Sequence, residues 1–211
     1  MNCIIVASGT LAYTPVIKTL LHGADLIIAA DGGANHLKAM NIQPHIIIGD
    51  MDSILPSEKR FFEKNHIPFI THPSRKDNTD TDLCIDSALE KGATYITLIG
   101  VTGQRLDHTL ANIFLLKRIS DLGIGARIVD ETNEIYLVTN YLELIGEPGE
   151  LLSVIPISDN VTGLSLKGLE YPIENASISM GSSLGISNCF KDTFATISVK
   201  TGTVLVTKSR E

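Results

Sequence analysis

Short apolar segments alternate with helical patterns over about the first 130 residues of the chain. The apolar segments are rich in β-branched residues and several lack polar alternation, which is typical of strands in a sheet covered on both faces. They span residues 2–8, 25–30, 45–48, 68–71, 95–99 and 126–129. Between them, Thr14 and Pro15 form a helix start, and Thr79 and Asp82 have capping-box spacing. The alternation predicts a doubly wound, mostly parallel α/β sheet domain.

The pattern changes at about residue 131, and no helical periodicity follows. Short expected strands, broken by Gly, Pro, Asn and Ser, span residues 134–139, 151–157, 161–166, 176–180, 195–200 and 203–208. Close spacing of this kind indicates an antiparallel sandwich or a small barrel, and we favour the smaller all-β sandwich. The expected domains are therefore residues 1–131 and 132–211.

Composition narrows the classes of protein and partner. Hydrophobic residues make up 44% of the 211 residues, which excludes an intrinsically disordered chain. Seventeen basic and 24 acidic residues give a net charge of −7, so nucleic acid and anionic membranes are poor electrostatic partners. The three cysteines lie outside any CxxC pattern, and no signal peptide or membrane span is recognisable. We therefore expect a cytoplasmic protein without zinc.

Four polar segments follow predicted strands. They are residues 31–35 (DGGAN), 49–53 (GDMDS), 75–82 (RKDNTDTD) and 100–108 (GVTGQRLDH). In open parallel sheets, ligands bind outside the carboxyl ends of the strands. We therefore expect these segments to meet at one edge of the sheet.

The acidic residues of these segments suit a magnesium site. So many carboxylates at one edge repel one another unless cations bind or some of them are protonated. For Asp50 and Asp52, which alternate just beyond an apolar strand, we favour metal ligation over a role in a turn. For Asp82 we favour a helix cap, and for Asp77 the two interpretations are evenly balanced.

Phosphate binding is the second candidate chemistry. Gly32 and Gly33 permit close backbone approach to a phosphate at a helix start, although a turn between strand and helix often needs a glycine. Neither the dinucleotide fingerprint nor the Walker motif is present. Lys76 and Arg105 could clamp phosphate oxygens or pair with the aspartates at the surface.

Two features of the second half allow a structural and a binding interpretation. Residues 181–188 form an uncharged run of small residues, which is a hairpin connection or a set of hydroxyl and amide groups for an organic ligand. Tyr171 suits either packing or ring stacking.

Five motifs in this order resemble the thiamine pyrophosphokinase family, bacterial type. They are residues 31–35, 49–53, 77–80, 103–108 and 185–188 (GISN), and the resemblance covers nearly the whole chain. The resemblance implies a homodimer with an N-terminal domain for ATP and Mg²⁺ and a C-terminal β-sandwich that helps to bind thiamine. It implies diphosphoryl transfer from ATP to the thiamine hydroxyl, with release of AMP.

The resemblance also implies roles for individual residues. Metal ligation falls to Asp50, Asp52 and Asp80, and these three acids with Asp107 and Arg105 form the expected catalytic set. The chemistry of the reaction, rather than the resemblance, makes either Asp80 or Asp107 the candidate acceptor of the hydroxyl proton. The expected ATP-binding residues are Asp31, Gly32, Gly33, Asn35, Lys76, Asp77, Gly103 and Arg105. The expected thiamine-binding residues are Tyr171, Ser187 and Asn188, with Tyr171 where other members carry a tryptophan.

Two other functions compete with this interpretation. The Asp50-x-Asp52 pair resembles that of haloacid-dehalogenase-type phosphatases, in which the first acid is a nucleophile. That motif usually ends the first strand, whereas two strand candidates precede it here. The other alternative is a non-catalytic nucleotide-binding module, which explains the crowd of aspartates poorly.

Overall fold

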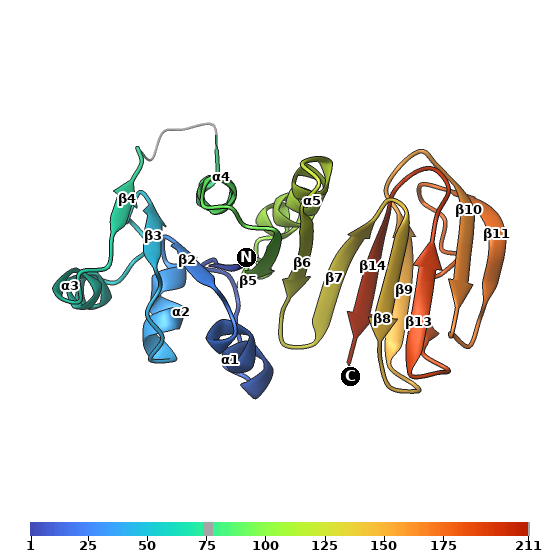
Figure 1. Ribbon diagram of the computed structural model, residues 1–211, viewed down its shortest axis with the longest axis horizontal. Helices are drawn as coiled ribbons and strands as arrows, with labels where there is room; N and C mark the ends of the chain where they lie inside the picture. The colour runs from blue at the N-terminus through green and yellow to red at the C-terminus, as the bar shows by residue number, and fades with distance from the viewer. Residues whose placement is uncertain (74–77, 211) are drawn as a thin grey trace. The chain divides into compact units, whose positions relative to one another are not determined.

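Alternating strands and helices build the first half of the chain (Figure 1). The computed structural model describes residues 1–73 and 78–210. The chain divides into two compact units, Met1–Glu131 and Thr132–Glu211. No helix in the described ranges combines the length and the apolar character needed to cross a membrane.

The first unit contains a parallel sheet with helices on both faces. Its strands are β1 (Asn2–Val6), β2 (Leu26–Ala30), β3 (Ile46–Gly49), β4 (Phe69–Thr71), β5 (Tyr95–Ile99) and β6 (Gly125–Val129). Its helices are α1 (Pro15–His22), α2 (Gly33–Ala39), α3 (Pro56–Lys64), α4 (Asp80–Glu90) and α5 (Leu106–Asp121). The strand order is β6-β5-β1-β2-β3-β4, and every neighbouring pair is parallel. The predicted doubly wound sheet is confirmed.

Strand order places a ligand crevice beside β1. The chain runs from β1 outward to β4 and then returns to β5 on the other side of β1. Ligands of doubly wound folds bind outside the carboxyl ends of the strands at such a reversal. Helix α2 contacts β1, β2 and α3, whereas α4 contacts β1, β2, β3 and α5 on the opposite face (Figure 1).

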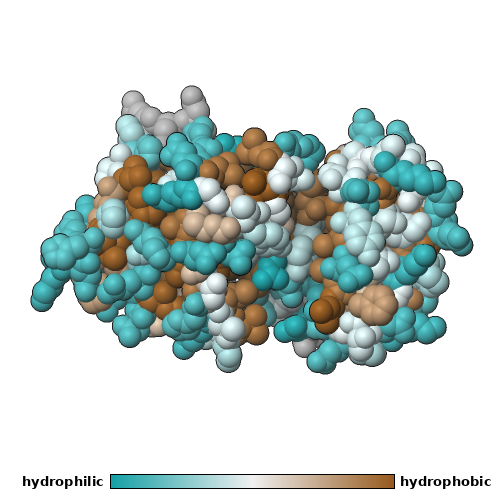
Figure 2. All heavy atoms as spheres, in the orientation of Figure 1, coloured by the Kyte–Doolittle hydropathy of each residue, from teal (hydrophilic) through white to brown (hydrophobic). Residues whose placement is uncertain are grey.

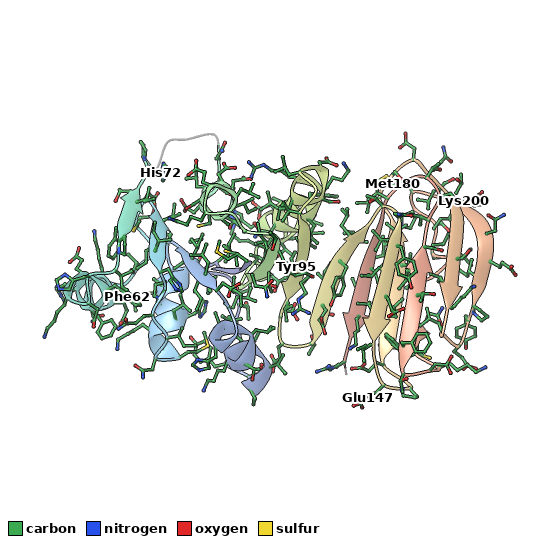
Figure 3. The ribbon with its side chains drawn as sticks, in the orientation of Figure 1. Phe62, His72, Tyr95, Glu147, Met180 and Lys200 are labelled. Carbon is green, nitrogen blue, oxygen red and sulfur yellow. The ribbon has the colours of Figure 1, made fainter. Side chains whose placement is uncertain are left out.

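Local sequence signals explain where the helices begin and which side they bury. The Thr14 hydroxyl accepts a hydrogen bond from the Ile17 N–H at 3.2 Å, and α4 begins with the expected capping box of Thr79 and Asp82. In α3, Phe62 (labelled in Figure 3) is fully buried, while hydrophilic side chains gather over the same helix in Figure 2. The cap role predicted for Asp82 is confirmed.

The second unit is a sandwich of two antiparallel sheets. Its strands are β7 (Asn133–Val138), β8 (Tyr141–Ile145), β9 (Leu151–Pro156), β10 (Asn160–Lys167), β11 (Ile173–Ser179), β12 (Asn188–Cys189), β13 (Phe194–Ser198) and β14 (Val204–Ser209). One sheet contains β12-β9-β14-β7 and the other β11-β10-β13-β8. Buried residues of both sheets, among them Val154, Val206, Leu166 and Ile197, form one core. The predicted sandwich is confirmed.

Two strands of the sandwich, β8 and β12, were not predicted from the sequence pattern. Strand β8 follows β7 after two residues, but the two strands belong to different sheets, so no hairpin turn marks their boundary. Strand β12 has only two residues and lies in the loop that suggested a hairpin connection. It pairs with β9 through Asn188 and Leu152.

Candidate active site

A cavity of about 730 Å³ opens at the carboxyl ends of β1, β2, β3 and β5. It is lined by residues 7–10, 30, 31, 50, 52, 53, 78–81, 100–105, 108, 109 and 112. The polar segments after β2, β3 and β5 and the residues that lead into α4 therefore meet, as the carboxyl-edge rule requires. Ser8, Gly9 and Thr10 after β1 were missed by the sequence reasoning, although the same rule applies to them.

Main-chain hydrogen bonds join the loops that follow β1 and β5. The Gly9 N–H donates to the Gly100 carbonyl at 2.7 Å, and the Thr10 N–H donates to the Thr102 carbonyl at 2.8 Å. A Cβ on Gly9 would lie 2.4 Å from the Thr102 oxygen, so only glycine permits this approach. The two loops form one continuous wall of the cavity.

His36 on α2 supports this wall from behind. Its Nε2 lies 2.8 Å from the Gly9 carbonyl oxygen, and its Nδ1 lies 3.1 Å from the Tyr13 hydroxyl. A carbonyl only accepts hydrogen bonds, so Nε2 carries the proton and a neutral ring accepts from Tyr13 at Nδ1. No sequence signal distinguished this histidine from the others.

Three carboxylates cluster in the cavity. Asp31, Asp50 and Asp80 each place one oxygen so that the three oxygens lie within 4.8 Å of one another. The three acids come from different elements. Asp31 directly follows β2, Asp50 directly follows β3, and Asp80 is the first residue of α4. Three oxygen ligands at this spacing suit a hard divalent cation such as Mg²⁺, which keeps several water ligands.

Burial distinguishes Asp31 from its two neighbours. Its exposed fraction is 4%, and the backbone is left-handed with φ of 45°. Oδ2 accepts a hydrogen bond from the Ser53 N–H at 3.1 Å, whereas Oδ1 is buried without a hydrogen-bond partner among the described residues. Desolvation raises the pKa of the Asp31 carboxyl, hydrogen bonds from Ser53 oppose this, and the charges of Asp80 and Asp50 add to the increase.

The raised pKa of Asp31 gives a pH-dependent test of this environment. The folded pKa lies above the ordinary value of about 4, so the stability contributed by Asp31 falls as pH rises through the folded pKa. At pH 7 without divalent metal, Asp31→Asn is expected to raise the melting temperature by roughly 2–4 °C, the shift that about 1 kcal/mol produces at this chain length. Asparagine tolerates the left-handed backbone.

Thermal unfolding in EDTA between pH 4 and pH 8 measures this effect. The advantage of Asp31→Asn over the wild type is expected to grow with pH. The control Asp86→Asn removes a partly exposed carboxylate on α4 that pairs with Arg118. If the melting temperature of Asp31→Asn at pH 7 is equal to or below that of the wild type, the ionised Asp31 carboxylate does not destabilise the fold, and this prediction is wrong.

Asp52 lies at the cavity but outside the carboxylate cluster. Its Oδ1 accepts a hydrogen bond from the Ser53 hydroxyl at 2.8 Å, and its N–H donates to Asp50 Oδ1 at 3.2 Å. Met51 between the two acids is left-handed, with φ of 66°. The structure therefore groups Asp31, rather than Asp52, with Asp50 and Asp80.

Arg105 and Asp107 form an exposed ion pair. Arg105 Nη2 lies 2.6 Å from Asp107 Oδ2, and both side chains are about two-thirds exposed. The hydrogen bond from Arg105 lowers the pKa of the Asp107 carboxyl below its ordinary value. Arg105 lines the cavity, whereas Asp107 is outside the lining residues. An exposed pair of this kind contributes little to stability, so the guanidinium is available to a stronger anion.

The remaining residues expected at the nucleotide site differ in position. Gly103 lines the cavity, but Gly32, Gly33 and Asn35 do not. Asn35 instead holds the segment after β3, because its Nδ2 donates to the Ser53 carbonyl and its Oδ1 accepts from the Leu55 N–H, both at 3.0 Å. Lys76 and Asp77 lie outside the described residues.

The expected thiamine-binding residues meet within the second unit. Tyr171 is 66% exposed, and both of its backbone polar groups bond to the buried side chain of Asn188. Ser187 is exposed and left-handed, with φ of 57°, and its N–H donates to the Ser153 hydroxyl at 3.0 Å. The buried amide of Asn188 is thus bonded to the backbone of one exposed residue, Tyr171, and follows the other, Ser187, in the sequence.

Comparison with known proteins identifies both units. The family described as "Thiamin pyrophosphokinase, catalytic domain" matches residues 17–128, and "Thiamin pyrophosphokinase, vitamin B1 binding domain" matches residues 139–204. A thiamine pyrophosphokinase of Bacillus subtilis is 34% identical over 209 residues, which cover 98% of each chain.

Solved structures agree with these matches. A crystal structure of the Bacillus subtilis thiamine pyrophosphokinase has a TM-score of 0.91 at 33% identity and covers all of both chains. That of Geobacillus thermodenitrificans has a TM-score of 0.87 at 28% identity and covers 100% of this chain and 98% of the other. Neither the phosphatase nor the binding module finds support in these comparisons. Sequence, fold and both domain matches thus agree, and the chain belongs to the thiamine pyrophosphokinase family of enzymes.

Proposed function

We propose that this enzyme transfers a diphosphoryl group from ATP to the hydroxyl of thiamine, yielding thiamine diphosphate and AMP. The cluster of Asp31, Asp50 and Asp80 in the cavity of the first unit carries this proposal. Transfer of this type asks the protein for positioning and charge neutralisation rather than for a covalent nucleophile. Carboxylates, Mg²⁺ and a guanidinium supply both.

The residues of the cavity fit a magnesium ion. The buried Oδ1 of Asp31 has no hydrogen-bond donor among the described residues, and a cation would supply the missing partner. Asp31, Asp50 and Asp80 would hold the ion, with Asp52 at the rim of the same cavity. When bound, Mg²⁺ neutralises phosphate charge and makes the phosphorus more electrophilic.

The wall of the cavity and Arg105 are proposed to position ATP. Gly103 belongs to this wall, and Arg105 would exchange its exposed partner Asp107 for phosphate oxygens, offsetting the charge that develops toward AMP. Gly32, Gly33 and Asn35 act indirectly, because they fix the backbone next to the carboxylates. We keep Lys76 as a proposed phosphate clamp because of its positive charge next to the aspartates in the sequence, and Asp77 as a proposed phosphate-site residue on the family resemblance.

One carboxylate is proposed to accept the proton of the thiamine hydroxyl. Asp107 is a weak candidate, because its pKa is lowered by Arg105 and it does not line the cavity. Asp80 lines the cavity and is the stronger candidate, through the carboxylate oxygen that would not hold the ion.

Thiamine is proposed to bind at Tyr171 and Ser187 of the second unit. The exposed ring of Tyr171 offers an aromatic face to the thiazolium cation, and Ser187 offers a hydroxyl group. This division assigns ATP and Mg²⁺ to Met1–Glu131 and thiamine to Thr132–Glu211.

Product analysis tests the proposed reaction. The purified protein is incubated with ATP, Mg²⁺ and thiamine, and the products are separated by chromatography. Equal amounts of AMP and thiamine diphosphate, abolished by EDTA, are expected. ADP with thiamine monophosphate would overturn the diphosphoryl mechanism, and free phosphate with unchanged thiamine would indicate a phosphatase.

A homodimer in the cytoplasm is proposed on the family resemblance. The dimer is supported by exposed apolar side chains on two neighbouring strands, β8 and β13. They are Tyr141, Ile145 and Phe194. The free thiols of Cys3, Cys84 and Cys189 fit a reducing compartment. Light scattering of the full-length protein is expected to give twice the 22.8 kDa chain mass, and a monomer that turns over thiamine would exclude the dimer.

A further inference from the structure

The side chain of Asn188 makes three hydrogen bonds with the backbone around it. Its Oδ1 accepts hydrogen bonds from the N–H groups of Tyr171 and Cys189, both at 3.0 Å, and its Nδ2 donates to the Tyr171 carbonyl at 2.7 Å. Only 2% of the residue is exposed. Both lone pairs of the oxygen are therefore used, and the amide group is out of reach of a ligand at the surface.

The bonds between Asn188 and Tyr171 complete a longer attachment between two segments. The Glu170 N–H donates to the Cys189 carbonyl at 3.0 Å, and Leu169 forms a bridge with Phe190. This backbone pairing ends at Tyr171. There the side-chain amide of Asn188, instead of a strand backbone, bonds to the N–H and the carbonyl group of Tyr171. The position of the exposed Tyr171 ring thus depends on Asn188.

We infer that Asn188 is a positioning residue that holds Tyr171 in place for thiamine, and not a contact to thiamine itself. The inference rests on the proposed binding of thiamine at Tyr171. It distinguishes the roles of two adjacent residues, because Ser187 is exposed and can reach a ligand whereas Asn188 is buried.

Aspartate at position 188 separates positioning from direct contact. Asn188→Asp keeps the size of the side chain and the acceptor for the Tyr171 N–H. It replaces the donor to the Tyr171 carbonyl with an oxygen, which repels that carbonyl. A direct contact with the thiamine cation would tolerate or favour the added negative charge, whereas the positioning role requires a loss.

Steady-state kinetics of the full-length enzyme provides the test. Asn188→Asp and Asn188→Ala are each expected to raise the KM for thiamine about tenfold, as loss of a buried hydrogen bond implies. The KM for ATP and kcat are expected to stay within roughly twofold of the wild type. In a Tyr171→Ala background, Asn188→Asp is expected to change the thiamine KM by less than roughly twofold, because both substitutions remove the same interaction.

A matched control separates the effect from a general loss of stability. Asn175→Ala removes a side-chain hydrogen bond to Lys200 (labelled in Figure 3) at 2.9 Å in the same unit. It is expected to leave the thiamine KM unchanged. Circular dichroism verifies folding of each variant. If Asn188→Ala does not fold, the nearly isosteric Asn188→Asp and its combination with Tyr171→Ala carry the test.

Two results would overturn the inference. One is an Asn188→Asp enzyme whose thiamine KM equals or falls below that of the wild type. The other is a full additional increase in the Tyr171→Ala background. Failure of the proposed function is recognised separately, because the wild-type enzyme would then form no thiamine diphosphate.

Discussion

Replacement of Asp50 by asparagine is expected to lower the turnover number about 10³-fold, the factor that about 4 kcal/mol of lost transition-state stabilisation produces. The substitution removes one of the three carboxylates that cluster in the cavity. The fold is expected to persist, because the asparagine oxygen can still accept the hydrogen bond from the Asp52 N–H. Turnover is measured at saturating ATP, Mg²⁺ and thiamine, and folding by circular dichroism.

Asp86→Asn is the matched control for Asp50→Asn. It makes the same change of charge on α4, where the carboxylate is partly exposed and pairs with Arg118 outside the cavity. Its turnover is expected to stay within roughly twofold of the wild type, since exposed ion pairs contribute little. A well-folded Asp50→Asn enzyme with more than about a tenth of wild-type turnover would remove the carboxylate cluster from the mechanism.

Replacement of Gly33 by alanine is expected to lower the free energy of unfolding by about 3 kcal/mol or more, because it forces an overlap inside a packed core. A Cβ at this position would lie 1.9 Å from the Val6 carbonyl oxygen and 2.6 Å from its carbon. Val6 ends the central strand β1, so the backbone cannot retreat without disturbing the sheet. Urea denaturation of the full-length protein measures the change.

Gly23→Ala is the control for this steric argument. Gly23 follows α1 with φ of −90°, and the atom nearest to its added Cβ is the Thr19 oxygen at 3.5 Å. This contact is an ordinary one, so the free energy of unfolding is expected to change by at most about 0.5 kcal/mol. Equal denaturation midpoints for Gly33→Ala and the wild type would contradict the close packing of α2 on β1.

The sequence predicted the fold of the first unit because its strands carry a strong, local signal. All five residues of β2, for example, are buried, which matches the uninterrupted apolar run that a doubly covered sheet requires. Strand β8 escaped because its signal is not local. It is an edge strand of the second sheet, and its apolar residues Tyr141 and Ile145 remain exposed, so no clear alternation of apolar and polar residues marks it.

The site was only partly predictable, for a reason that concerns backbone conformation. The rule for parallel sheets names the loops that meet, but the direction of each carboxylate depends on φ and ψ at single residues. Asp31 and Met51 are both left-handed, and a pattern of residue types does not reveal this. The sequence analysis assigned Asp50, Asp52 and Asp80 to metal ligation and Asp31 to ATP binding, and it did not predict that an oxygen of Asp31 lies within 4.8 Å of oxygens of Asp50 and Asp80.

The hydrogen bonds that join the loops after β1 and β5 have a consequence for how this cavity can vary. Main-chain atoms of Gly9, Thr10, Gly100 and Thr102 set the shape of the wall. Side chains at Ser8 and Thr10 can therefore be exchanged without moving it, provided that glycine remains at positions 9 and 100. The shape of the cavity and the chemical groups on its surface are thus set by different atoms, so these groups can be altered one side chain at a time.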